Sequence, residues 1–101
     1  MSKLVRDKIP ELIESRGGFC VFHKASDEYS YALLEKLVEE SNEVRNARNK
    51  TEIAQELADV LEVYDALLTA YGHSHEDILA IKEQKKEERG GFEKGIILDK
   101  W

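Results

Sequence analysis

The sequence has few of the residues that stabilise secreted or membrane proteins. It contains a single cysteine, Cys20, so it cannot form an internal disulfide, and this is typical of a reducing compartment. No apolar run approaches the roughly 20 residues of a membrane span. The first residues also lack the apolar stretch of a signal peptide. We therefore expect a cytoplasmic protein without a membrane partner.

An excess of positive charge is also missing. The 15 lysines and arginines are outnumbered by 21 aspartates and glutamates, which gives a net charge of −6. Binding to nucleic acid through its phosphates requires the opposite balance, so we expect no nucleic-acid partner. The 101 residues predict one domain, 1–101, near the lower limit of what a single core can stabilise. Association with a second copy would bury more apolar surface.

Turn residues and apolar periodicity predict two helices in the first half of the chain. The first lies within RDKIPELIESRGG, where Pro10 is tolerated in the first turn and Gly17 and Gly18 end the helix. The second follows an N-cap at Ser26 and continues to about Arg48. The segment NARNKT then supplies polar residues for a tight turn.

Two further helices are predicted in the second half. One covers about 52–71 and has Gly72 at its C-terminal cap position. The other begins with the capping box of Ser74 and Asp77 and ends at Gly90. The segments 19–25 and 92–101 are partly apolar without helical period, so we expect them to be extended. The predicted fold class is all-α.

The third predicted helix carries two acids among its apolar residues. At about 100° per residue, most of its leucines, valines and alanines form an arc of more than half the circumference. Glu56 and Asp59 project within this arc and not from the polar strip. Unpaired buried carboxylates are costly, so these two should share a cation or be protonated.

The second predicted helix shows a weaker form of the same pattern. Its core stripe is expected to consist of Leu34, Leu37, Val38, Ser41 and Val44. Glu40 borders this stripe, and Glu43 lies about 60° from it around the helix axis.

If the second and third helices pack antiparallel, the acid pairs Glu40/Glu43 and Glu56/Asp59 can converge. Four oxygen donors without a histidine suit Mg²⁺ or Mn²⁺, and the Glu-x-x-His pattern of di-iron bundles is absent. The alternative is that these acids simply lie on solvated helix faces.

The fourth predicted helix places Lys82, Lys85, Lys86 and Arg89 on one side. Such a cationic face could bind a polyphosphate chain. Alternatively, it is a solvated surface supported by Glu–Lys pairs three or four residues apart.

The acidic residues also match a family motif. The sequence Glu39-Glu40-Ser41-Asn42-Glu43, followed after twelve residues by Glu56-Leu57-Ala58-Asp59, resembles the EExxE…ExxD motif of MazG-like nucleotide pyrophosphohydrolases. The segments KLVRDKIPELI and KKEERGGFEKGIIL resemble small members of the same group. The resemblance implies the helical bundle of the all-α NTP pyrophosphatases, in which an antiparallel helix pair carries the metal site and oligomerisation completes the fold.

The resemblance further implies hydrolysis of a nucleoside triphosphate, or a related nucleotide, to a monophosphate and pyrophosphate. It also implies a homodimer or homotetramer and a role in removing surplus or non-standard nucleotides. By match to the motif, the Mg²⁺ ligands would be Glu40, Glu43, Glu56 and Asp59. Glu39, Glu40 and Glu43 would be the catalytic positions, with Glu39 supporting the site or orienting water. The substrate phosphates would contact Lys82, Lys86 and Arg89.

Two other functions are compatible with the sequence. Phosphoribosyl-ATP is an alternative substrate for the same kind of site. A non-catalytic helical dimer that binds a metal or a basic partner is an alternative of a different class. No residue indicates a preference for a particular base or sugar.

Overall fold

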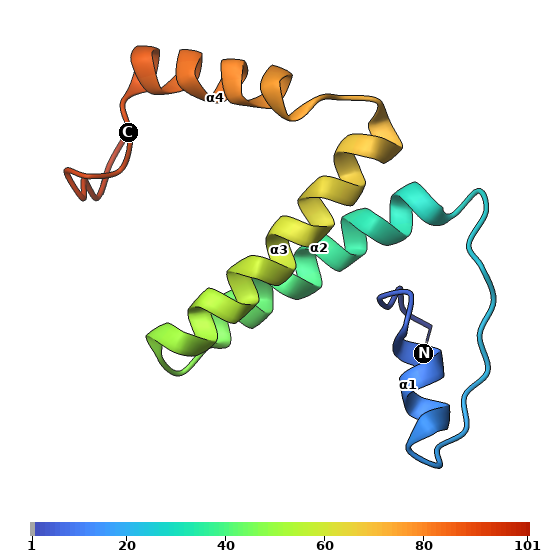
Figure 1. Cartoon of the computed structure of the whole chain (residues 1–101). Coiled ribbons are helices and arrows are strands. Elements are labelled where there is room, and N and C mark those ends of the chain that lie inside the picture. Colours follow the sequence, from blue (N-terminus) through green and yellow to red (C-terminus); the bar gives the residue numbers. More distant parts are fainter. Residues whose placement is uncertain (1) are drawn as a thin grey trace. The chain divides into compact units, whose positions relative to one another are not determined.

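The structure is a computed structural model that describes residues 2–101, and its regular elements are four α-helices (Figure 1). These are α1 (Ile9–Ser15), α2 (Tyr29–Asn46), α3 (Lys50–Tyr71) and α4 (His75–Arg89). No strand occurs within 2–101, so the predicted all-α class is confirmed. The chain forms two compact units, one ending at Tyr71 and the other covering Gly72–Trp101. A single domain over 1–101 therefore stays a prediction.

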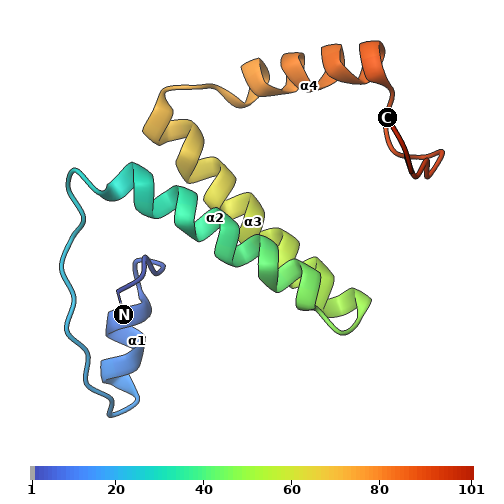
Figure 2. The ribbon, with the colours of Figure 1, turned by 180° about the vertical axis from the view of Figure 1, so that it is seen from behind.

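Helices α2 and α3 run antiparallel side by side, as both Figure 1 and the reverse view in Figure 2 show. Ala47 has an extended backbone (φ −63°, ψ 140°) and ends α2. The side chain of Asn49 then accepts a hydrogen bond from the backbone N–H of Glu52 at 2.9 Å. This bond satisfies one of the free donors at the start of α3, which explains why α3 begins slightly earlier than predicted.

The hydrophobic core between α2 and α3 is small. Its buried apolar side chains are Leu33 of α2, 3% exposed, and Val63 of α3, 8% exposed. The predicted core stripe of α2 is wrong in part, because Leu34 and Val38 are exposed. Leu33, rather than these two residues, is the buried apolar residue of α2. Many of the other apolar residues are only partly buried, and several are exposed.

The predicted N-cap of α2 is also wrong. Helix α2 begins at Tyr29, after Glu28, and Glu28 makes no side-chain capping bond. The backbone N–H and hydroxyl of Ser26 instead donate to the carboxylate of Glu28, at 3.3 and 3.5 Å. Ser26 is therefore engaged in the turn before the helix.

The predicted N-cap of α4 is confirmed, because the Ser74 hydroxyl accepts from the backbone N–H of Asp77 at 3.1 Å. The segments 19–25 and 92–101 form no strand, and most of their side chains are exposed. No helix within 2–101 is long and apolar enough to cross a membrane.

Candidate metal centre

Three carboxylates meet between α2 and α3. Glu40 comes from α2, and Glu56 and Asp59 come from successive turns of α3. Each offers an oxygen atom, and these atoms lie within 4.8 Å of one another. The spacing of three residues places Glu56 and Asp59 on one face of α3, and the antiparallel packing brings Glu40 to that face. We call Glu40, Glu56 and Asp59 the acidic cluster.

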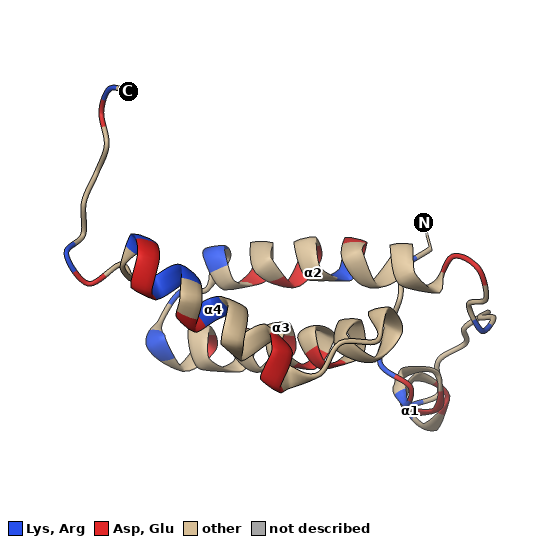
Figure 3. Ribbon diagram, turned by 90° about the horizontal axis from the view of Figure 1, so that it is seen from above, with Lys and Arg blue, Asp and Glu red and all other residues tan. Residues whose placement is uncertain are grey.

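The acidic cluster lies next to the small core and is shielded from water to different degrees. Glu40 is 9% exposed, which is low for a charged residue, and Glu56 and Asp59 are partly buried. Val63, one turn beyond Asp59 on α3, is part of the core. Figure 3 shows acidic segments on both helices where they run side by side.

The surroundings of Glu56 raise its pKa. Partial burial raises the pKa of Glu56, and the neighbouring charges of Asp59, Glu43 and Glu40 raise it further. A hydrogen bond with Asp59 acts in the same direction. A cation bound in the acidic cluster would offset this negative charge and lower the pKa of Glu56.

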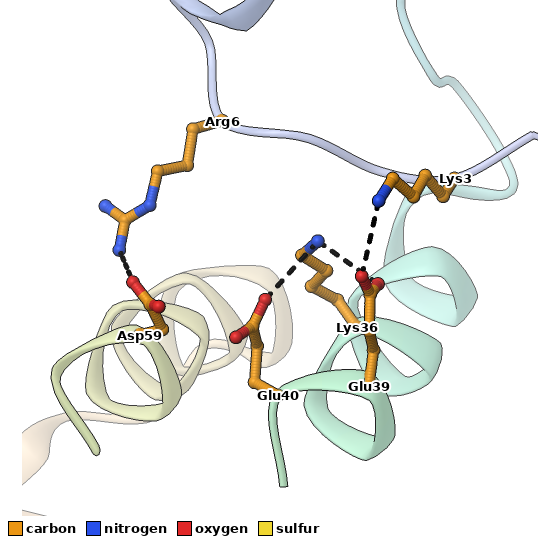
Figure 4. A network of polar contacts seen from close by, with 6 residues as sticks. All are labelled: Lys3, Arg6, Lys36, Glu39, Glu40 and Asp59. Carbon is orange, nitrogen blue, oxygen red and sulfur yellow. Dashed lines mark hydrogen bonds and ion pairs between the residues drawn. The ribbon is translucent and has the colours of Figure 1, made fainter. Parts of the chain in front are cut away.

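Two basic side chains already contact the acidic cluster (Figure 4). The Arg6 guanidinium donates to Asp59 Oδ1 at 2.6 Å, and Lys36 Nζ lies 3.4 Å from Glu40 Oε1. Glu56 has no such ion pair among the interactions of residues 2–101. The three carboxylates of the acidic cluster thus outnumber the two basic side chains that contact them.

Glu39 lies beside the acidic cluster and not within it. Its carboxylate is 3.1 Å from Lys36 Nζ and 3.5 Å from Lys3 Nζ. Partial burial would raise the pKa of Glu39, but the attraction of Lys36 and Lys3 outweighs it and lowers that pKa. Glu39 thus stays ionised and pairs with both lysines, of which Lys36 also contacts Glu40.

The remaining predicted acid, Glu43, is exposed and lies outside the group of three. Its charge is nonetheless close enough to raise the pKa of Glu56. The structure thus brings together three of the four predicted ligands and leaves the fourth nearby. The ligand role of each stays a prediction.

The predicted phosphate contacts Lys82, Lys86 and Arg89 all lie on α4, in the unit Gly72–Trp101, and are exposed. Lys82 Nζ is 3.4 Å from a Glu83 carboxylate oxygen, and Lys86 Nζ is 4.0 Å from one of Glu93. These are exposed ion pairs of the kind expected for a solvated helix. The phosphate-binding role stays a prediction.

The sequence analysis did not predict the two basic residues, Arg6 and Lys36, that contact the acidic cluster. Lys36 was recognisable in principle, because it precedes Glu39 by three residues and Glu40 by four. Arg6 carried no such signal, since 53 residues separate it from Asp59. Only the folded chain reveals that contact.

A cleft of about 410 Å³ adjoins the acidic cluster. Glu40 and Asp59 line it, and the basic residues Arg6, Lys8 and Lys36 also contribute to its walls. Its volume falls within the range of small-molecule sites. A ligand in this cleft would meet carboxylates and basic groups together, which suits a phosphate ester bound with a divalent cation.

The donor set of the acidic cluster fits a hard cation. All three groups are carboxylates, and no thiol or imidazole belongs to the group. Mg²⁺ and Mn²⁺ prefer such oxygen ligands, whereas zinc sites usually include nitrogen or sulfur. Together, the antiparallel helices and the acidic cluster define a helical protein with a candidate divalent-metal site.

Comparison with known families gives the class of this protein. Residues 22–86, more than half of the chain, match the phosphoribosyl-ATP pyrophosphohydrolase family. The chain belongs to this family, which is part of the all-α NTP pyrophosphatase superfamily. No curated protein and no solved structure shows a significant match.

The family assignment confirms two predictions. The fold is that of the all-α pyrophosphatases, and the protein is a hydrolase that acts on phosphoanhydride bonds. Members of the family typically depend on a divalent metal, and the acidic cluster is consistent with this.

Proposed function

We propose that this protein hydrolyses nucleoside triphosphates to the monophosphate and pyrophosphate, with Mg²⁺ as the natural cofactor and Mn²⁺ as a substitute. The observation that carries the proposal is the convergence of Glu40, Glu56 and Asp59 within 4.8 Å, in a chain that belongs to a pyrophosphohydrolase family. Removal of non-standard or surplus nucleotides would be a suitable role for such an activity.

In this proposal, Glu40, Glu56 and Asp59 hold the metal, and Glu43 adds the fourth carboxylate of the motif. Bound there, the metal would offset charge on the phosphate oxygens and lower the pKa of an attacking water. Glu39 keeps Lys36 and Lys3 in place at the edge of the site.

Water is the nucleophile in this proposal, so the protein's task is to bind and orient the substrate and to hold charge. Glu39, Glu40 and Glu43 are the proposed catalytic positions. Lys82, Lys86 and Arg89 are proposed contacts of the substrate phosphates.

Phosphoribosyl-ATP is a second candidate substrate. It is favoured by the family to which residues 22–86 match. Its cleavage breaks the same kind of phosphoanhydride bond, so the acidic cluster serves both substrates equally well. The two candidates differ in groups far from the reacting phosphates.

The test is pyrophosphate release from a panel of canonical and modified nucleoside triphosphates and from phosphoribosyl-ATP, with Mg²⁺ or with a chelator. We expect release that requires the metal and that is lost in Glu40→Gln. Asp65→Asn is the matched control, because Asp65 is an exposed acid of α3 outside the acidic cluster. No release from any substrate would favour a non-catalytic metal-binding or partner-binding protein.

We also propose that a second copy covers the exposed apolar face of α2 and α3. This face includes Leu34 and Val38 of α2 and Leu57 and Leu61 of α3, which are 42–59% exposed. So large an apolar surface beside so small a core is typical of an interface between subunits.

Light scattering after size-exclusion chromatography tests the association. A dimer or tetramer is expected for the natural sequence, and Leu57→Lys should dissociate it. Thr69→Lys, at an exposed polar position of α3, is the control and should leave the oligomer intact. A monomeric natural protein would refute this proposal.

A further inference from the structure

The segment before α1 contributes a basic residue to the candidate site. Leu4 and Val5 are half-buried and line the cleft together with Leu33 and Val63 of the core. This anchoring places the next residue, Arg6, above α3. Figure 4 shows its side chain directed at Asp59.

Arg6 holds the carboxylate that a metal would need. Its guanidinium is 2.6 Å from Asp59 Oδ1 and 3.9 Å from Glu62 Oε1. A divalent ion bound by Asp59 would repel Arg6 and compete with it for the same oxygen atoms. Binding of the metal and the Arg6–Asp59 ion pair therefore oppose each other.

Arg6 is also more exposed than the other basic residue that contacts the acidic cluster. The Arg6 side chain is 55% exposed, whereas that of Lys36 is 15% exposed and is held by both Glu39 and Glu40. Once released from Asp59, the Arg6 guanidinium would still line the cleft. Its planar fork of N–H donors matches the oxygen atoms of a phosphate group.

We propose that Arg6 is a phosphate-binding residue of this site, and that metal binding releases it from Asp59 to contact the substrate. The phosphate contact rests on the proposed function, whereas the competition with the metal does not. The region matched by the family, residues 22–86, does not include Arg6. The proposal thus gives a role to a segment that the family match leaves without one.

The first test uses the metal alone. Titration calorimetry with Mn²⁺ should show about two- to fivefold tighter binding to Arg6→Ala than to the natural sequence, the range expected for the loss of a half-exposed ion pair. Arg48→Ala is the control, because Arg48 pairs with Glu52 and not with the acidic cluster. Unchanged or weaker Mn²⁺ binding to Arg6→Ala would overturn the proposal.

The second test uses inorganic pyrophosphate with saturating Mg²⁺. Arg6→Ala should bind it at least tenfold more weakly, and Arg6→Lys should recover part of the loss because the charge is kept. Equal affinity in Arg6→Ala and the natural sequence would overturn the phosphate role. Neither test requires turnover. The Mn²⁺ test is decisive even if no nucleotide is hydrolysed, and the pyrophosphate test measures phosphate binding by Arg6 separately from hydrolysis.

Discussion

The sharpest prediction concerns Asp59→Asn and the stabilisation of the protein by Mg²⁺. A ligand that binds only the folded state stabilises it by RT ln(1 + [L]/Kd), which is about 2.7 kcal/mol at 100 times Kd. In a domain of this size, each kcal/mol raises the Tm by roughly 4–8 °C. The natural sequence should therefore gain about 11–22 °C at that Mg²⁺ concentration.

The substitution removes one of the three clustered carboxylates and keeps the size of the side chain. Loss of a ligand should weaken Mg²⁺ binding by about 100-fold, the upper end of what changes around metal sites produce. The same Mg²⁺ concentration then equals the Kd of the Asp59→Asn variant. The stabilisation of the variant falls to about 0.4 kcal/mol, which corresponds to a Tm increase of roughly 2–3 °C. Because each protein is compared with and without Mg²⁺, the effect of losing the Arg6–Asp59 ion pair on the stability of the metal-free protein cancels. Its effect on Mg²⁺ affinity, about two- to fivefold, is small beside the expected 100-fold loss.

Differential scanning fluorimetry over a Mg²⁺ series measures both shifts, and calorimetry provides the Kd that fixes the concentration. Asp65→Asn, which lies on the same helix outside the acidic cluster, should behave as the natural sequence does. The Mg²⁺ concentration for this comparison is 100 times the Kd of the natural sequence. If the Tm of Asp59→Asn still rises by more than about 10 °C there, Asp59 is not a metal ligand.

Three further predictions concern the helix ends. Ser74→Ala should destabilise the start of α4 by about 1 kcal/mol, because the bond to the Asp77 N–H is lost, and amide hydrogen exchange in α4 would report it. Gly72→Ala should cost roughly 1–2 kcal/mol in urea unfolding, since φ is +70° and the added methyl group meets no other atom, so backbone strain alone acts. The side chain and the backbone N–H of Arg48 lower the pKa of Glu52 in the folded protein. The Arg48–Glu52 pair therefore stabilises the fold at pH values above the pKa of Glu52 in the unfolded chain. This stabilisation is lost as the pH falls through the pKa of Glu52 in the folded protein. Arg48→Gln should therefore raise the pKa of Glu52 in an NMR titration, and an unchanged value would contradict the ion pair.

The helices of this protein could be predicted from its sequence. Apolar periodicity and turn residues located all four helices, and Ser74 was identified as a cap because its hydroxyl bonds to a residue only three positions away. The predicted cap at Ser26 was wrong: α2 begins only after Glu28, and the Glu28 carboxylate accepts hydrogen bonds from the Ser26 backbone N–H and hydroxyl. Such short-range contacts leave no periodic signal.

The candidate site could be predicted in part, because helical periodicity is a local property of the sequence. Glu56 and Asp59 share a face because α3 advances about 100° per residue, and this follows from the sequence alone. The convergence with Glu40 required only the further assumption of antiparallel packing. Glu43 was expected with them both from its position on the second helix and from the motif, yet it lies outside the group of three in the folded chain.

The sequence by itself determined the helices, the N-cap of α4 at Ser74 and the spacing of the acids, because these depend on contacts within a few residues. The tertiary structure decided which side of each helix is buried, so that Leu33 and Val63 form the core while Leu57 remains exposed. It also decided that Arg6 lies against Asp59, 53 residues away. Helical periodicity fixes the relative directions of side chains on one helix, but the rotation of that helix against its neighbours and the path of a loop depend on packing between distant parts of the chain.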